Sequence, residues 1–349
     1  MSMNVSRFLG LFVTAFLAVS TSGAQAELAA SCKETLSAKR ISLVVQTGPG
    51  GGFDMVARLV APRLAETIGV SDVQVKNMPS GGGLLAVKHV LENSERDIAI
   101  GYFTLTDYVE QTNDVKREDL MPIAGIVDQE AVWVGRSDFD LNPQTLEGLS
   151  MPLWRPTSRI IAYYYFTALA LGTQPKLVFG YTDSGDLHNA MLRGELDINP
   201  LAADTAKKTI KSGGAKVILT FADKPSLNFP DAPFLLGPDG LVAKFSAGES
   251  PETIERRMKL ATVAAEFSPS KRGAFVYSKM KLELRACLEQ AFAVTLADQK
   301  LLDDAKAAKF ELSPSSAPEV QAYAVAMQAR TKELAAEFDA ARQEIAKLR

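Results

Sequence analysis

The sequence predicts an α/β fold made of two strand–loop–helix units, and three observations lead to this prediction. The chain has 349 residues, which is enough for two domains of common size. Two glycine runs, Gly50–Gly52 and Gly81–Gly83, each follow a short β-branched run and precede a helical pattern. The same alternation starts again after about residue 122. Such alternation is typical of a largely parallel sheet covered by helices.

The first unit is expected to present both glycine runs at the carboxyl ends of its strands. Apolar residues recur at helical spacing after the first run and stop at Gly69, which predicts a helix. In a parallel sheet the loops after the strand ends meet at one edge, so we expect residues 102–104 beside the glycine runs. The predicted strands are 41–46, 73–77 and 97–103, and the predicted helices are 53–69 and 84–94.

The second unit repeats the alternation and leads into a mainly helical region. Its predicted strands are 122–127, 131–136, 151–154, 176–181, 196–199 and 215–222, with helices at 158–171, 187–194 and about 204–211. Loops at 155–158, 182–185 and 199–203 follow strand ends and are expected to face the first loop cluster across a cleft. The last third is predicted to contain helices at 251–266 and 281–297, a strand at 273–278 and one long surface helix at 316–347.

The glycine runs do not fit the common nucleotide-binding motifs. Neither run is followed by the Lys-Ser or Lys-Thr pair of a P-loop. The dinucleotide fingerprint fails at the first run, where Phe53 replaces the last glycine, and Gly81, Gly83 and Ala86 match it only weakly. Bare backbone N–H groups at the positive end of a helix bind carboxylate or phosphate, so we expect an anion site. The alternative is that the glycines only permit tight turns and close packing.

Charge and the N-terminus narrow the class of protein. The net charge is −3, so we expect no nucleic-acid partner. Residues 1–26 combine Arg7, a short apolar stretch and small residues up to Ala26, which is the pattern of a signal peptide cleaved after Ala26. The apolar stretch is too short for a membrane span, and no later segment offers about 18 uncharged apolar residues. We expect the mature chain to be exported and soluble.

Cysteine and histidine usage argues against metal or triad chemistry. Cys32 and Cys287 can form a disulfide in an oxidising compartment, and two buried thiols are the alternative. His89 and His188 lie in helix-like stretches without a second ligand candidate one turn away, so we expect packed or solvated side chains. We therefore expect no metal, no cofactor and no enzymatic activity.

The region from Ser42 to Gly83 carries a family resemblance. It contains a strand, the loop Pro49–Asp54, a helix with Ala57 and Arg58, and a second strand that ends at Asn77 before the second glycine run. This arrangement resembles the substrate-binding receptors of tripartite tricarboxylate transporters, the Bug or TctC-type proteins. Further similarity covers nearly the whole mature chain and lies at 120–127, 179–198, 229–233, 284–292 and 310–320.

This resemblance implies a type II periplasmic-binding-protein fold with two α/β lobes and a ligand cleft between them. The first lobe would comprise 27–126 and 271–349, and the second would comprise 127–270. Such a receptor captures a small organic carboxylate in the periplasm and delivers it to the membrane permease of a tripartite carrier. We expect it to act as a monomer.

The resemblance also implies which residues contact the ligand. The two glycine loops would hold one carboxylate, and the second lobe would contact the rest of the molecule. The residues expected in the first lobe are Pro49, Gly50, Gly51, Gly52, Phe53, Asp54, Ser80, Gly81, Gly82, Gly83, Tyr102 and Thr104. Those expected in the second lobe are Thr157, Ser158, Tyr181, Thr182, Ser184 and Asn199.

Several positions depart from the family pattern or have two interpretations. Phe53 stands where a small polar residue is common, and it either stacks on an aromatic acid or packs under the loop. Asp54 is expected to accept backbone N–H groups at the helix start, and contact with a ligand ammonium is the alternative. Arg155 and Arg159 either meet a distal carboxylate or are ordinary surface residues. Residues 236–280 match the family poorly.

Two other functions stay open at this point. A receptor of the same fold could present its ligand to a membrane sensor instead of a permease. An exported hydrolase with an unrecognised site is the second alternative, although the two histidines and the missing nucleophile motifs argue against it.

Overall fold

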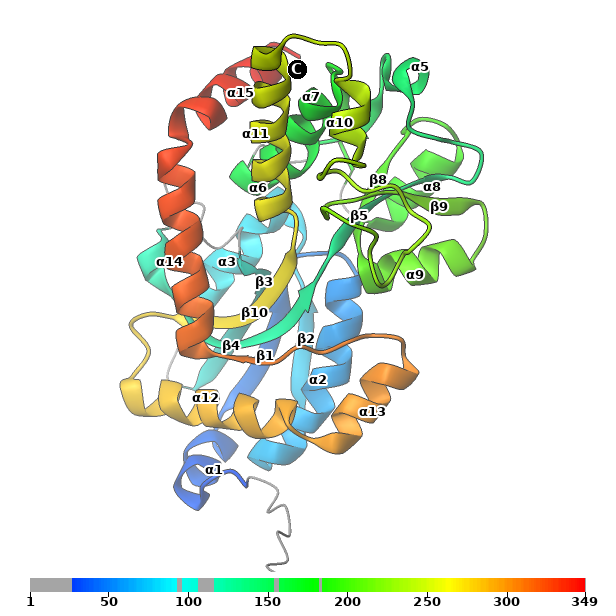
Figure 1. Cartoon of the computed structure of the whole chain (residues 1–349). Helices are drawn as coiled ribbons and strands as arrows, with labels where there is room; N and C mark the ends of the chain where they lie inside the picture. The colour runs from blue at the N-terminus through cyan, green and yellow to red at the C-terminus, as the bar shows by residue number, and fades with distance from the viewer. Residues whose placement is uncertain (1–26, 93–95, 106–115, 154–156, 182–183, 349) are drawn as a thin grey trace, which may run out of the picture.

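The computed structural model describes residues 27–92, 96–105, 116–153, 157–181 and 184–348. These residues form a two-lobe α/β fold (Figure 1). In that view the lower lobe contains β1–β4 and β10, and the upper lobe contains β5, β8 and β9. The predicted fold class is thereby confirmed.

The lower lobe is built on a six-stranded sheet with the strand order β11-β4-β10-β3-β1-β2. β1 pairs in parallel with β2 and β3, and Ile41 lies opposite both Val73 and Ile98. β10 pairs antiparallel with β3 and β4, and β11 pairs antiparallel with β4. The bounds are β1 Arg40–Val45, β2 Val73–Asn77, β3 Asp97–Thr104, β4 Leu120–Gln129, β10 Ser270–Tyr277 and β11 Ser315–Ser316.

Helices cover this sheet and bury its apolar side chains. α2 ends at Gly69 as predicted, because a glycine tolerates the left-handed φ of 87° found there. α2 and α12 pack together in a core that includes Val60, Leu64 and Phe292. The bounds are α1 Ala30–Ser37, α2 Gly52–Ile68, α3 Leu84–Leu91, α12 Leu282–Leu296 and α13 Gln299–Ala307, with short 3-10 helices at Ser80–Gly83 and Arg117–Asp119.

The upper lobe has a three-stranded sheet in which β5 lies antiparallel to β8 and β9, and a parallel pair of β6 and β7. The strand bounds are β5 Ala131–Arg136, β6 Ser150–Pro152, β7 Lys176–Val178, β8 Asn199–Ala202 and β9 Ala215–Thr220. The helices are α5 Pro143–Leu146, α6 Ser158–Ile160, a π-helix Ile161–Phe166, α7 Thr167–Leu171, α8 Ser184–Leu192, α9 Ala203–Lys211, α10 Leu241–Phe245 and α11 Pro251–Phe267.

The sequence placed β8 too early. Residues 196–199 were predicted as the strand and 199–203 as a loop, whereas Asn199–Ala202 pairs with β5. Pro200 lies opposite Trp133 in an edge strand, where a residue without an N–H group is tolerated. The predicted loop at 199–203 is therefore wrong, and α9 begins directly after the strand.

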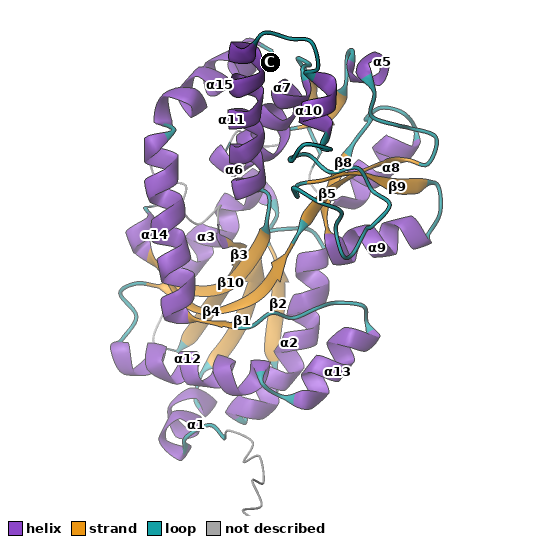
Figure 2. Cartoon of the chain, in the orientation of Figure 1, coloured by secondary structure: helices purple, strands orange, loops and turns teal. Residues whose placement is uncertain are grey.

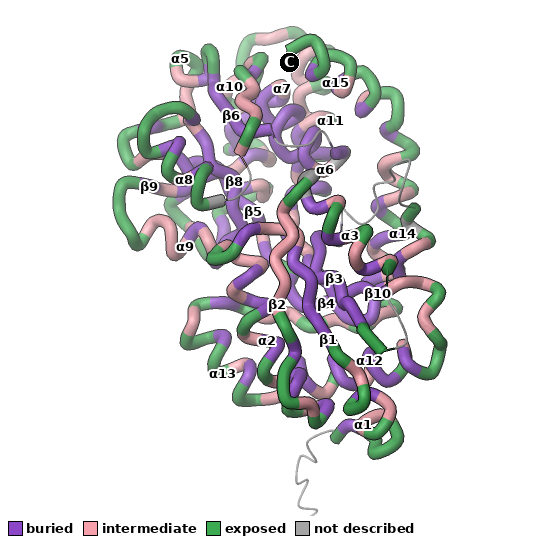
Figure 3. Tube along the Cα trace, turned by 180° about the vertical axis from the view of Figure 1, so that it is seen from behind, coloured by how far each residue is buried: buried purple, intermediate pink, exposed green. Residues whose placement is uncertain are grey.

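Two of the segments that connect the lobes are neighbours. β4 leads into β5 with Glu130 alone between them, and α11 leads into β10 through residues 268–269 (Figure 2). β4 and β10 are paired at this crossing, where Lys271 lies opposite Asp128. One buried core continues from the lower sheet into the helices of the upper lobe and contains both Phe275 and Phe267 (Figure 3).

The C-terminal region is not the single surface helix that was predicted. It forms α14 Ala317–Glu333 and α15 Ala335–Lys347, and both helices bury an apolar face. α14 packs on β4, and α15 places Phe338 against Phe166 in the upper lobe, with ring centroids 5.3 Å apart. α15 therefore packs with the upper lobe, although the family resemblance implied that residues 271–349 belong to the lower one.

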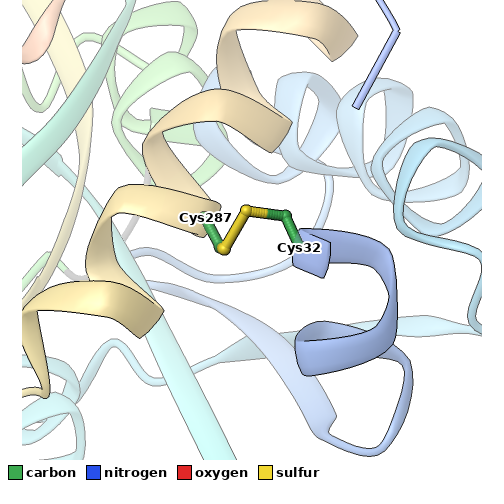
Figure 4. The surroundings of a disulfide bond; sticks show 2 residues. All are labelled: Cys32 and Cys287. Carbon is green, nitrogen blue, oxygen red and sulfur yellow. A yellow bond between two sulfur atoms is a disulfide. The ribbon is translucent and has the colours of Figure 1, made fainter. Parts of the chain in front are cut away.

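A disulfide joins α1 to α12 in the lower lobe. Cys32 and Cys287 are 255 residues apart in the sequence, and their Cα atoms lie 5.1 Å apart (Figure 4). Of the two alternatives left open by the sequence, the structure has the disulfide. Among the residues that the structure describes, no helix is both long enough and apolar enough to span a bilayer.

Candidate functional site

The first glycine loop is held in place by Asp54. This carboxylate is 3% exposed and accepts a hydrogen bond of 2.9 Å from the Gly50 N–H. It also forms an ion pair of 3.0 Å with Arg58, one helical turn away. Burial alone would raise the pKa of Asp54, but the hydrogen bonds from Arg58 and Gly50 outweigh it and hold the pKa below its usual value of 3.8. Asp54 therefore has the expected role at the helix start.

The two glycine loops lie side by side, as the sequence predicted. Asn77 donates from its side-chain nitrogen to the Thr47 carbonyl over 3.0 Å, and Met78 donates its N–H to Val45 over 2.8 Å. Gly83 has a φ of 90°, and a Cβ added there would lie only 2.8 Å from the Cβ of Gln46. Glycine is needed at this position for both its backbone angle and the close approach of the first loop.

The first turn of α2 faces the first turn of α9 in the other lobe. Because Gly51 precedes α2, no side chain caps its N–H groups. A Cβ added to Gly52 would lie 2.8 Å from the hydroxyl oxygen of Thr205, which belongs to the first turn of α9. The positive ends of two helix dipoles thus meet between the lobes. Their convergence favours an anion at this place.

Arg272 adds a cationic side chain to the same place. It lies on β10, is 6% exposed, and its Cζ lies 4.2 Å from the ring centroid of Phe53. Phe53 also packs against Tyr102, with ring centroids 5.3 Å apart. Burial raises the pKa of the Tyr102 hydroxyl to about 12, although the positive charge of Arg272 opposes this rise. Phe53 therefore packs under the loop between two side chains.

Sequence reasoning missed Arg272. The residue lies in the segment that matched the family poorly, and a single arginine in a strand has no motif that identifies it. The pairing of β10 with β3 and β4 places it near the carboxyl ends of the parallel strands, because Arg272 lies opposite Thr104. Only this antiparallel pairing could have identified it.

Three predicted site residues lie in strands and not in loops. Tyr102 and Thr104 belong to β3 and are 1% and 4% exposed. Asn199 belongs to β8 and is fully buried, and its side-chain amide has no hydrogen-bond partner among the described residues. Tyr102 and Asn199 lay at the ends of the predicted strands 97–103 and 196–199, and Thr104 lay one residue beyond the first of these. The structure extends β3 to Thr104 and begins β8 at Asn199. Their contact with a ligand stays a prediction.

Three of the predicted residues of the upper lobe, Thr157, Ser158 and Ser184, lie where helices begin. Thr157 accepts the Ile160 N–H over 3.2 Å and so caps α6, which begins at Ser158. Ser184 begins α8, and the Tyr181 hydroxyl donates to Glu195 over 3.1 Å. Thr182 and Arg155 lie outside the described residues.

Of the remaining candidates, Arg159 and His89 have local partners. Arg159 donates to the Ser268 carbonyl over 3.1 Å, and its Cζ lies 5.2 Å from the Tyr163 ring centroid, so it joins α6 to the crossing segment. His89 lies 3.8 Å from Glu92, and burial lowers the pKa of His188. In the part of the chain that the structure describes, no group of three or more His, Cys, Asp and Glu side chains is arranged to hold a metal ion.

Asp54→Asn should lower the free energy of unfolding by about 1 kcal/mol at pH 7, because an amide keeps the Gly50 acceptor but loses the ion pair. The folded pKa lies below the unfolded value, so this stabilisation is present above pH ~4 and is lost as pH falls through the folded pKa. Chemical denaturation of both proteins between pH 7 and pH 3 should show the difference shrinking only below pH ~4.

Asp239→Asn is the control for this comparison, because it removes an exposed loop carboxylate. It should change the free energy of unfolding by less than about 0.5 kcal/mol. If the difference in free energy of unfolding between Asp54→Asn and wild type grows towards pH 3, the lowered pKa of Asp54 is contradicted.

Comparison with known proteins gives one sequence relative and several solved structures. No protein-family model matches the chain. A UPF0065 protein of Bordetella pertussis (strain Tohama I) is 24% identical over 270 residues, which are 68% of this chain and 79% of that protein. A TctC solute-binding protein from Polaromonas is 17% identical, covers 87% of this chain and 100% of its own, and gives a TM-score of 0.54.

Two further structures contain an organic acid. MatC (Rpa3494) from Rhodopseudomonas palustris, with bound malate, is 16% identical, and the match covers 83% of this chain and 98% of MatC with a TM-score of 0.62. Rpa4515 from R. palustris, with adipate, is 16% identical, and the match covers 86% and 97% of the two chains with a TM-score of 0.62.

These matches identify the fold. The chain has the two-lobe fold of periplasmic solute-binding proteins. More particularly, its structural neighbours are TctC and Bug-type solute-binding proteins, so the resemblance seen in the sequence is confirmed by the fold.

Proposed function

We propose that this protein is an exported solute-binding receptor that captures a small organic carboxylate between its lobes. The observation that carries the proposal is the meeting of two helix N-termini, where the uncapped first turn of α2 faces the first turn of α9. Donors that are already oriented bind an anion without a large ordering cost. Malate and adipate in two structures of the same fold support a carboxylate ligand.

The mechanism that we propose is a hinge closure of the two lobes. One lobe supplies the glycine loops and the other supplies α9, so a ligand that contacts both favours the closed arrangement. β4 and β10 cross between the lobes as a hydrogen-bonded pair and would act as the hinge. The glycine loops would hold the ligand mainly through backbone N–H groups, with Ser80 and the upper-lobe residues Thr157, Ser158, Tyr181, Thr182 and Ser184 as proposed contacts.

Delivery to a membrane permease is part of the same proposal. The resemblance of the sequence to receptors of tripartite tricarboxylate transporters and the TctC-type structural neighbour lead us to propose a tripartite carrier as the partner, with the receptor in the periplasm after cleavage at Ala26. Restoration of carboxylate uptake in a strain that lacks the receptor tests this step. If the protein binds the acid but does not restore uptake, it is a ligand receptor that does not serve the permease.

Thermal unfolding of residues 27–349 against a panel of acids tests the binding function directly. The panel contains malate, adipate, citrate, amino acids and aromatic carboxylates, each measured after unfolding and refolding to remove copurified ligand. A ligand at 100 times its dissociation constant adds about 2.7 kcal/mol of stability, which raises Tm by several degrees. We expect a selective rise with one class of acid. Each acid is tested at about 10 mM, which is roughly ten times a Kd of 1 mM. If no acid changes the Tm at this concentration, the proposal is contradicted.

A further inference from the structure

Arg272 is unusual among the charged residues of this protein. Among the Lys and Arg side chains that the structure describes it is the one that is buried, at 6% exposed, and no carboxylate of the described residues lies within ion-pair distance of it. The two buried acids have other donors. Asp54 binds Gly50 and Arg58, and Asp204 accepts from Gln129 over 2.5 Å and from the Glu311 N–H over 2.6 Å. The charge of Arg272 is therefore buried without a counterion among the described residues.

The guanidinium is oriented by its neighbours. Its Nε donates to the Ser270 hydroxyl over 3.1 Å, and its Cζ lies 4.2 Å from the Phe53 ring centroid. Its two Nη atoms lie 3.4 and 3.8 Å from the position of a Cβ added to Gly52. Both terminal nitrogens thus lie at the first turn of α2, where the helix has N–H groups without intrahelical acceptors.

Burying a charge without a partner is costly, and the cost is offset when an anion binds. A guanidinium held in one plane by an aromatic ring matches the two oxygens of a carboxylate. The first turn of α2 adds N–H donors and the positive end of the helix dipole on the same side. The arrangement combines a fixed cation, oriented backbone donors and close contact with Thr205 of the opposite lobe.

We propose that Arg272 binds a carboxylate group of the captured acid, together with N–H groups of the first turn of α2. This inference rests on the proposed receptor function and assigns the specificity of the site for a carboxylate to one side chain. Phe53 then serves to orient Arg272, and it is not free to stack on an aromatic ligand, because Tyr102 and Arg272 both contact its ring. A neutral amide analogue of the acid cannot replace the charge and should bind far more weakly.

Isothermal titration with malate, adipate and citrate tests the assignment. The proteins are wild type, Arg272→Gln, Arg272→Lys and the control Lys300→Gln. Lys300 lies on α13, outside the crossing segments, its side chain pairs with Asp304, and its removal changes the net charge by the same amount. Adipamide serves as the neutral analogue of adipate.

We expect Arg272→Gln to weaken binding of the acid that wild type prefers by about 30-fold or more. Arg272→Lys should weaken it by about 3- to 10-fold, because an ammonium keeps the charge and loses the bidentate geometry. Lys300→Gln should stay within about 2-fold of wild type, because its exposed charge is already paired with Asp304. The Tm of ligand-free Arg272→Gln should fall by no more than about 2 °C, since the variant removes a charge without a counterion.

The experiment distinguishes failure of the role of Arg272 from failure of the receptor function. If wild type binds an acid and Arg272→Gln binds it equally well, the role of Arg272 is overturned and the receptor function stands. If Arg272→Gln does not fold, equal binding by Arg272→Lys overturns the role in the same way. A large fall in Tm of Arg272→Gln with unchanged affinity would make the residue structural. If wild type binds none of the three acids and no acid of the wider panel, the receptor function fails, and the assignment fails with it.

Discussion

Replacing Phe338 with alanine will lower the free energy of unfolding by about 3–5 kcal/mol. The side chain is fully buried, and its ring lies 5.3 Å from Phe166 and 5.5 Å from Phe267 between centroids. These residues come from α15, the π-helix and α11, so one ring joins three elements of the upper part of the molecule. Truncation removes the apolar surface and leaves a cavity that this packing cannot fill. Chemical denaturation followed by circular dichroism measures the loss.

Val325→Ala is the matched control for Phe338→Ala. Val325 lies on α14, is 49% exposed and belongs to the same C-terminal region. Its truncation should change the free energy of unfolding by less than about 0.5 kcal/mol. A loss below about 1 kcal/mol for Phe338→Ala would show that α15 does not pack on the upper lobe in solution.

Removing the disulfide by Cys32→Ala with Cys287→Ala should cost about 2–4 kcal/mol. The bond joins residues that are 255 positions apart, so its loss gives the unfolded chain much more conformational freedom. It also frees α1, which the disulfide joins to α12. The Tm of wild type in reductant should fall to near that of the double variant. Thermal unfolding with and without reductant measures both effects.

The double variant provides its own control, because it has no sulfur bond to reduce. Its Tm should be the same with and without reductant. If wild type, with both thiols shown by alkylation to be free, keeps its full Tm in reductant, the bond makes no contribution to stability.

The local elements were predictable because their causes are local. A β-branched run, a glycine loop and an apolar period of 3.6 residues define β1, Gly50–Gly52 and α2 within about 30 residues. The stop at Gly69 and the role of Asp54 at the helix start follow from backbone angles and N–H groups only a few residues away.

Predictions failed where distant parts of the chain decide the structure. Burial against β5 makes a strand of Asn199–Ala202 despite Pro200. Packing on two lobes divides the C-terminal helix at Leu334, although its sequence is continuous and rich in alanine. Local propensity is weak compared with such burial, so a pattern that is read along the chain cannot show these outcomes.

The sequence by itself determined the α/β class, the paired glycine loops and the resemblance to a carboxylate receptor, because these depend on short motifs and periodicity. Only the tertiary structure decided that Arg272, on an antiparallel strand from a distant part of the chain, lies at the first turn of α2. The same holds for Thr205 from the second lobe. An anion site requires several donors at one point in space, and which donors meet there depends on strand pairing and lobe packing that no sequence spacing encodes.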